Sequence, residues 1–174
     1  MITLDQVKQE IHNWTKNYLD VPSDHYSGHK PCPFAKKTLD TNDYRIELTS
    51  EHPSKWYQEF AEDDKKIYII AYQPDMIGLG GAVEELNLQW AQDDVWGIAF
   101  EPSDEVPEDE ANDSEEWGSV TDESYPFLLV QSLSELQALS LSLEKKGYYK
   151  KCSPDFMKQF NARKELRHAR TNER

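Results

Sequence analysis

The residues best suited to chemistry lie in one short stretch, HYSGHKPCPFAKK, between His25 and Lys37. It holds two of the five histidines, His25 and His29, and one of the two cysteines, Cys32, which stands between two prolines. Imidazole and thiolate groups serve as catalytic bases, as nucleophiles and as metal ligands. This stretch is therefore the candidate site of the chain, and it supports two chemical hypotheses.

The first hypothesis makes Cys32 a nucleophile or redox thiol, with His25 or His29 as its base. Pro33 is typical of the first residue of a helix, which would place Cys32 near the N-cap of a short helix over residues 34–39. The partial positive charge of a helix N-terminus stabilises a thiolate and lowers its pKa. The protein would then be a small enzyme or redox protein with a pocket around these three residues. The same residues also fit a buried structural cysteine in a tight turn.

The second hypothesis is a divalent metal held by His25, His29 and Cys32, which have the spacing H-x3-H-x2-C. Three protein ligands leave the open fourth position that a catalytic zinc or iron site requires. Further ligands available to complete the site are Asp24, His52 and Cys152. Neither a paired C-x2-C nor an H-E-x-x-H motif accompanies the spacing, so the sequence leaves the cofactor open.

Charge supports a different class of function. The net charge of −14 disfavours direct binding of nucleic acid, which depends on Lys and Arg neutralising phosphates, and favours a basic protein partner. The segment 101–123 contains eleven acidic residues and no basic one, so we expect a solvated, partly disordered insertion loop. The alternative function is thus a non-catalytic acidic interaction protein that binds a basic partner or mimics the charge of nucleic acid.

Length and composition favour a single domain over residues 1–174, with 37% hydrophobic and 11% aromatic residues to form a core. No apolar run approaches the roughly 20 residues of a membrane span, and the N-terminal residues lack the pattern of a secretory signal. We therefore expect a cytoplasmic protein without membrane contact. The sequence does not indicate an oligomeric state.

Periodicity predicts the elements that position these residues. Leu4, Val7 and Ile11 open an apolar stripe of helical spacing, and Thr3 with Gln6 forms a capping box that starts this helix. We expect strands over 44–48, 66–72, 95–100 and 126–131, and further helices over 54–61, 82–91, 132–146 and from 153 onward. The glycines in the segment 78–81 lack the spacing of a dinucleotide fingerprint and the lysine of a P-loop, so they predict a flexible turn.

The order of elements from Lys66 onward is β-α-β-β-α, and Tyr148 and Tyr149 could add a short last strand. This order is the split β-α-β pattern of a ferredoxin-like layer. The predicted fold is α+β, with helices packed on a single mixed or antiparallel sheet and extra helices at both ends of the chain.

Two short segments carry a resemblance to a known family. Trp14, followed by Cys32-Pro33-Phe34-Ala35 and a basic residue, resembles an uncharacterised family of small bacterial proteins marked by a Cys-Pro-Phe-Ala motif. Tyr125-Pro126, which leads into a strand and then a helix, is similar to a Tyr-Pro segment late in those proteins. The resemblance implies a shared α+β scaffold and a role for Cys32. The acidic segment 101–123 departs from the family pattern.

Overall fold

The computed structural model describes residues 2–24, 26–101 and 125–171, which form a four-stranded sheet with helices on both faces. The strands, in sheet order, are β1 (Tyr44–Thr49), β2 (Ile67–Tyr72), β4 (Phe127–Ser132) and β3 (Val95–Phe100). The α-helices are α1 (Leu4–Trp14), α2 (Ala35–Asp40), α3 (Pro53–Glu62), α4 (Leu79–Trp90), α6 (Leu133–Lys145) and α7 (Pro154–Thr171). The predicted α+β class is confirmed.

The sheet is mixed. β1 and β2 are parallel, whereas β4 runs antiparallel to both of its neighbours, β2 and β3. Strands β2 and β3 therefore run in the same direction, are joined by α4, and leave between them a gap that β4 fills. This is the split β-α-β unit that the order of elements predicts.

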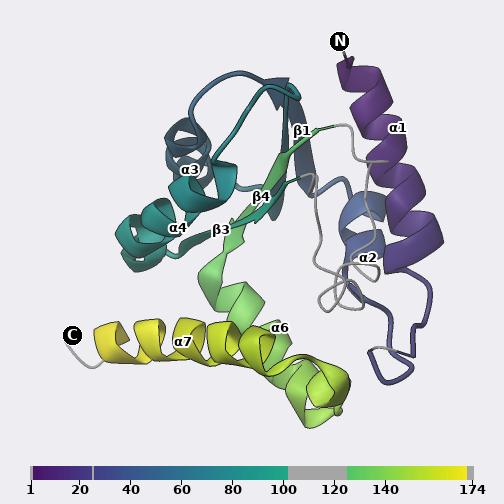
Figure 1. Cartoon of the computed structure of the whole chain (residues 1–174), viewed down its shortest axis with the longest axis vertical. Helices are drawn as coiled ribbons and strands as arrows, with labels where there is room; N and C mark the ends of the chain where they lie inside the picture. The colour runs from purple at the N-terminus through teal and green to yellow at the C-terminus, as the bar shows by residue number, and fades with distance from the viewer. Residues whose placement is uncertain (1, 25, 102–124, 172–174) are drawn as a thin grey trace.

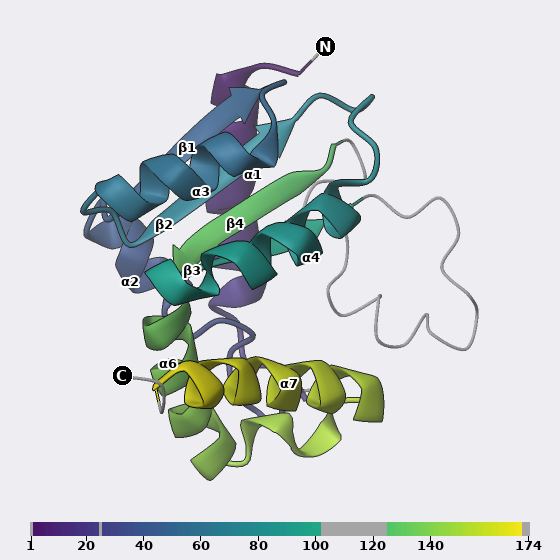
Figure 2. The same ribbon diagram turned by 90° about the vertical axis from the view of Figure 1, so that its left-hand side faces the viewer.

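Two hydrophobic layers flank the sheet, because strand β2 alternates its side chains between two covered faces. Tyr68, Ile70 and Tyr72 point to the face that α3 and α4 cover, while Ile69 and Ala71 point to the face that α1 covers. Figure 1 shows the sheet between these helices, and Figure 2 shows α3 and α4 lying in front of the strands with α1 behind.

Helix α1 begins as the sequence predicts. The Thr3 hydroxyl accepts the Gln6 N–H, and the Gln6 side chain accepts the Thr3 N–H, which completes the capping box. A π-helical turn, η1 (Thr15–Leu19), extends the helix to the loop before α2. Val7 and Ile11 are almost fully buried against the sheet.

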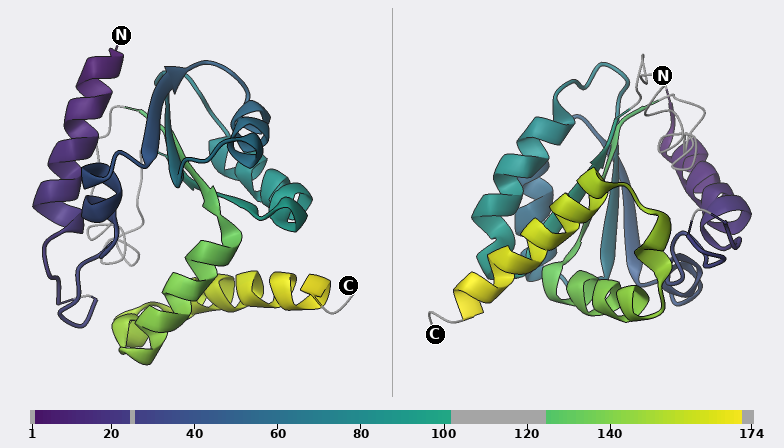
Figure 3. Two further views of the ribbon diagram at one scale, coloured as in Figure 1. Left: turned by 180° about the vertical axis from the view of Figure 1, so that it is seen from behind. Right: turned by 60° about the horizontal axis from the view of Figure 1, so that its bottom comes forward.

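A C-terminal arm formed by α6 and α7 lies at one end of the sheet (Figure 3). Ser132 is both the last residue of β4 and the N-cap of α6, so no linker separates strand from helix. The buried positions of α6 include the polar residues Gln137 and Ser140. They face α7, where the Gln137 amide donates to the Arg163 carbonyl (2.8 Å) and the Arg163 guanidinium donates to the Ser140 hydroxyl (3.1 Å).

The segment after α6 differs from its prediction. Residues Tyr148–Lys151 form a 3-10 turn, η3, and not an edge strand, because Gly147 ends α6 at a φ of 79° and reverses the chain. Tyr148 is buried there against the N-terminal loop. The prediction of a last strand is therefore wrong.

The glycine segment is helical in part. Gly78, at a φ of 72°, is the N-cap of α4, and Gly80 and Gly81 lie within its first turn. The Glu101 carboxylate accepts the Leu79 N–H at 2.7 Å, so an acidic side chain of the protein itself fills the N-terminus of α4. The rest of the predicted acidic insertion lies outside the described residues. No helix within the described ranges is long and apolar enough to cross a membrane.

A side-chain amide closes the outer edge of β3. Asn87 of α4 accepts the Gly97 N–H (2.7 Å) and donates to the Gly97 carbonyl (3.0 Å), as a neighbouring strand would. The Tyr57 hydroxyl of α3 also donates to the Asn87 side-chain oxygen (2.8 Å). Position 97 requires glycine, because a Cβ there would lie 1.9 Å from the Tyr57 hydroxyl oxygen.

Candidate functional site

The predicted site residue Cys32 lies in the loop between η1 and α2 and is half-buried. Its N–H donates to the Leu19 carbonyl (3.3 Å), and its carbonyl accepts the Ala35 N–H (3.2 Å). Helix α2 begins at Ala35, two residues later than Pro33 predicted. Cys32 therefore precedes the helix by a short turn and is not its N-cap.

Burial raises the pKa of the Cys32 thiol. Hydrogen bonds from the backbone N–H groups of Phe34 and Ala35 oppose the change but are the smaller effect. This direction is opposite to the one predicted from a helix N-terminus, because desolvation disfavours the thiolate more strongly than the backbone dipoles stabilise it. Burial thus opposes formation of a reactive thiolate at Cys32, and the role of this thiol stays a prediction.

Of the two histidines predicted to act as a base for Cys32, the structure describes His29. The His29 ring donates through Nε2 to the Lys146 carbonyl (3.3 Å), and no hydrogen bond within the described part of the chain joins it to Cys32. His25 lies outside the described residues. The described residues thus show no pairing of His29 with Cys32, and a pairing of His25 with Cys32 stays a prediction.

The described residues do not show the predicted metal site either. The described residues contain no group of three or more His, Cys, Asp or Glu side chains arranged to hold a metal ion. His52, a suggested further ligand, instead caps α3, where its Nδ1 accepts the Ser54 N–H (3.3 Å). The predicted trio itself includes His25 and so is not placed as a whole.

The loop that contains Cys32 contacts the C-terminal arm. The Tyr148 hydroxyl donates to the carbonyl of Pro31, and the Tyr148 ring packs on Tyr26 with a centroid distance of 4.9 Å. Tyr26 is 2% exposed. Tyr26 and Pro31, both from the stretch between His25 and Lys37, therefore hold the N-terminal loop against η3.

A second location is an open cleft lined mainly by charged and polar side chains. A cleft of about 280 Å³, here called the acidic cleft, opens where the loop between α3 and β2 meets the start of α6. Its lining residues are Phe60, Asp63, Asp64, Lys65, Lys66, Asp94, Ser132, Ser134 and Glu135. Four carboxylates against two lysines give this lining a net negative charge.

Both lysines of the acidic cleft are already engaged. The Lys66 ammonium lies 2.6 Å from a Glu135 carboxylate oxygen, and this contact raises the pKa of Lys66. The Lys65 ammonium donates to the Asn42 carbonyl (3.2 Å). Because Lys66 and Glu135 pair with each other, the remaining lining has three carboxylates, Asp63, Asp64 and Asp94, against one lysine, and this charge suits a cation rather than an anion.

Asp94 is held rigidly in the cleft. It has a φ of 62°, and its carboxylate accepts hydrogen bonds at 2.7 Å from the Ser132 hydroxyl, the Ser134 hydroxyl and the Ser134 N–H. The carboxylate thus caps α6 and fixes the position of this helix against the sheet.

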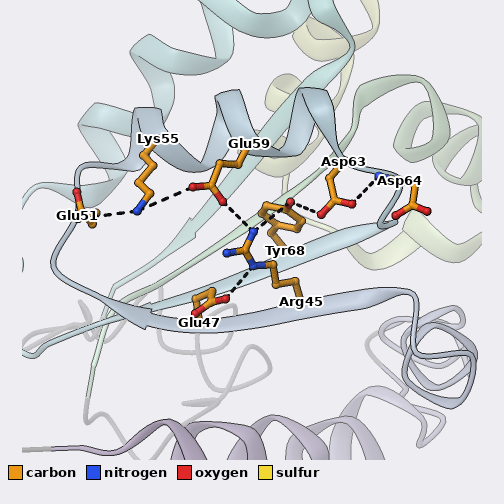
Figure 4. A network of polar contacts seen from close by, with 8 residues as sticks. All are labelled: Arg45, Glu47, Glu51, Lys55, Glu59, Asp63, Asp64 and Tyr68. Atoms are coloured by element: carbon orange, nitrogen blue, oxygen red, sulfur yellow. Dashed lines mark hydrogen bonds and ion pairs between the residues drawn. The ribbon is translucent and has the colours of Figure 1, made fainter.

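A polar network connects the cleft to strand β1 (Figure 4). The Tyr68 hydroxyl donates to the Asp63 carboxylate (2.5 Å) and lies 3.5 Å from the Arg45 guanidinium. Arg45 also donates to the carboxylates of Glu47 and Glu59, both at 2.8 Å. The Asp63 side of the cleft is thereby anchored to α3, β1 and β2.

The network fixes two protonation states. The hydrogen bond from Tyr68 lowers the pKa of Asp63, so this carboxylate is ionised over the whole neutral range. Burial, aided by the Asp63 charge, raises the pKa of Tyr68 to about 12, so the phenol stays protonated. Neither group changes charge near neutral pH.

Sequence reasoning missed the acidic cleft because its residues come from three separate turns. The signals were present as the run Glu62–Lys66 after a helix, Asp94 before a strand, and Ser132, Ser134 and Glu135 at a helix start. Only the sheet order, which puts β4 beside β2 and β3, brings these turns together.

Comparison of the chain with family models, with curated proteins and with solved structures finds no match in any of the three. The resemblance to the Cys-Pro-Phe-Ala family therefore stays a prediction.

Proposed function

We propose that this protein is a non-catalytic acidic protein that binds a basic protein segment, with the acidic cleft receiving a Lys or Arg side chain of the partner. The observation that carries the proposal is the cleft lining, where Asp63, Asp64, Asp94 and Glu135 surround one opening of about 280 Å³. That volume suits one or two inserted side chains rather than a nucleotide-sized ligand.

The cleft is preorganised for such a contact. Hydrogen bonds hold Asp63 to Tyr68 and Asp94 to the start of α6, so two of the four carboxylates lose little freedom when a cation binds. Asp64 is exposed at the rim, where an incoming cation can reach it. A site whose charges are fixed before binding requires less ordering of side chains and binds more tightly.

The protonation states support binding rather than proton transfer. A general acid or base works best with a pKa near the operating pH. The pKa of Asp63 is lowered and that of Tyr68 is raised, so each moves away from neutrality. A permanently ionised carboxylate suits a permanent cation.

The charge of the whole chain supports the same kind of partner. A net charge of −14 attracts a basic segment over long range and speeds its association, while the cleft supplies the local contacts. Binding should weaken as salt rises, since ions screen exposed charges beyond about 10 Å at 0.1 M.

The test is titration of the purified protein with a fluorescent oligo-arginine peptide, followed by anisotropy over a range of salt concentrations. We expect binding at low salt that weakens in Asp64→Lys by about two- to tenfold, as for loss and reversal of one exposed charge contact. An oligo-glutamate peptide of the same length should not bind.

Glu85→Lys is the matched control, because Glu85 is exposed on α4, does not line the cleft and carries the same charge. Equal weakening in Asp64→Lys and Glu85→Lys would mean that the peptide responds only to total charge, and the cleft would then have no part in binding. Absence of binding to the wild type at low salt would refute the proposed function itself.

A further inference from the structure

The two edges of the sheet are not equivalent. The outer edge of β3 is closed at Gly97 by the Asn87 amide, whereas β1 pairs with one strand, β2, and its other edge has no strand partner among the described residues. An open strand edge presents backbone N–H and C=O groups that can add a further strand. The β1 edge is therefore the place where another chain can extend the sheet.

The side chains of β1 divide into two kinds. Arg45 and Glu47 lie on the α3 face and are 35% and 32% exposed. Tyr44, Ile46 and Leu48 lie on the α1 face and pack in its hydrophobic layer. Figure 4 shows the Arg45 guanidinium between Glu47 and Glu59 above the strand.

We propose that β1 is a self-complementary interface through which two copies of this chain form a dimer, with their β1 strands antiparallel about a two-fold axis at Ile46. Residues opposite each other in an antiparallel pair share a face of the sheet. This register sets Arg45 against Glu47 of the second copy, twice across the axis. On the other face it sets Tyr44 against Leu48 of the second copy, also twice.

The charges select this register over its neighbours. An axis at Arg45 would oppose the two Arg45 side chains, and an axis at Glu47 would oppose the two Glu47 side chains. Like charges directly opposite destabilise a strand pair, whereas opposite charges and apolar pairs stabilise it. An axis at Ile46 gives opposite charges on one face and apolar pairs on the other.

Arg45 is already oriented for the contact. Its guanidinium lies 5.4 Å from the centroid of the Trp56 ring and 5.2 Å from that of Tyr68, and it is bound to Glu59 at 2.8 Å. Arg45 also donates through Nε to Glu47 of its own copy, and the remaining N–H groups of the guanidinium can donate to the Glu47 carboxylate of the second copy. The resulting assembly is a continuous sheet of two copies with closed two-fold symmetry.

Sedimentation velocity measures the dimer directly. The mass of the wild type should rise from 20.3 kDa towards twice that value between about 1 and about 100 µM protein. Over this concentration range a dimer with a micromolar Kd becomes the main species. Glu47→Arg makes the edge wholly basic and Arg45→Glu makes it wholly acidic. Each variant alone should sediment as a monomer, and an equimolar mixture should recover the dimer.

The mixture also controls for folding, because only two folded variants can restore the interface; circular dichroism of each variant alone completes this control. A wild type that stays monomeric at the highest concentration overturns the proposal. Homodimers that persist in both single variants overturn it too, since they would show that the contact lies elsewhere.

A cysteine cross-link checks the register. In a background with Cys32→Ser and Cys152→Ser, Ile46→Cys should form a disulfide between copies with oxidised glutathione, because opposite Cα atoms lie about 5 Å apart. Leu48→Cys is the control, since its two copies would be offset by four residues, or about 13 Å along the strands. Equal cross-linking at both positions refutes the axis at Ile46.

Discussion

The buried cluster of Tyr57, Asn87 and Gly97 allows a quantitative prediction. In Asn87→Ala three buried groups lose their partner: the Gly97 N–H, the Gly97 carbonyl and the Tyr57 hydroxyl. Each buried polar group left without a partner costs about 1–3 kcal/mol, so we expect the free energy of unfolding to fall by about 3–9 kcal/mol. That is a large part of the roughly 5–15 kcal/mol that stabilises a typical domain.

Tyr57→Phe should cost far less. It removes one hydrogen bond, of about 1 kcal/mol, and leaves the Asn87 side-chain oxygen with the Gly97 N–H as donor. The expected order is therefore Asn87→Ala well above Tyr57→Phe in destabilisation, measured by urea unfolding followed by circular dichroism.

Gly97→Ala tests the close approach in the same cluster. The added Cβ would meet the Tyr57 hydroxyl oxygen at 1.9 Å and its Cζ at 2.7 Å, so the ring must move and the Asn87 contact must break. In a Tyr57→Phe background the closest atom is already gone, and the same substitution should cost less. A double-mutant cycle measures this coupling.

Two results would refute the reasoning about the cluster. One is a cost for Gly97→Ala below about 0.5 kcal/mol, the range of ordinary surface substitutions. The other is additivity of Gly97→Ala and Tyr57→Phe, which would mean that the two side chains do not compete for the same space.

Three further predictions follow from the contacts described above. Because burial raises the pKa of Cys32, a thiol reagent should label it slowly in a Cys152→Ser protein at neutral pH, and faster only above about pH 8.5; rapid labelling at pH 7 would restore the reactive-thiol hypothesis. In Tyr68→Phe the free energy of unfolding should vary less with pH than in the wild type, both at acidic and at alkaline pH, as measured by urea unfolding across pH. The lowered pKa of Asp63 makes its contribution disappear as pH falls through that pKa, and the raised pKa of Tyr68 makes its contribution disappear as pH rises from about 10 towards about 12; identical profiles for variant and wild type would contradict this. Glu101→Gln should lower the free energy of unfolding by about 0.5–1 kcal/mol, because the carboxylate then no longer faces the N-terminus of α4, and an unchanged midpoint in urea would show that the contact adds nothing.

Local patterns predicted most of the elements because their causes are local. Thr3 and Gln6 cap α1 through groups three residues apart. The run Ile67–Tyr72 is apolar at successive positions, so both faces of this strand must be covered. The split β-α-β unit follows from the order of elements alone. The wrong strand at Tyr148 also has a local cause, the reversal at Gly147, but the strand prediction there rested on the two aromatic residues and not on the turn.

The candidate sites depend on burial and on contacts between residues that are far apart in the sequence. The pKa of Cys32 is set by burial, which local sequence does not report, so the prediction from a helix start took the wrong sign. The acidic cleft depends on β4 pairing with β2, which brings Glu135 within 2.6 Å of Lys66 across a separation of 69 residues. No spacing along the chain encodes that contact.

The contacts between the N-terminal loop and the C-terminal arm have a consequence for biosynthesis. The Tyr148 hydroxyl reaches the carbonyl of Pro31, and the His29 ring reaches the carbonyl of Lys146, each across 117 residues. A ribosome that has made the loop must therefore add more than a hundred residues before its partners exist, while the sheet precedes them in synthesis. The loop around Cys32 should reach its native conformation only after the rest of the sheet has emerged, and a nascent chain stalled before Gly147 should still carry an accessible Cys32.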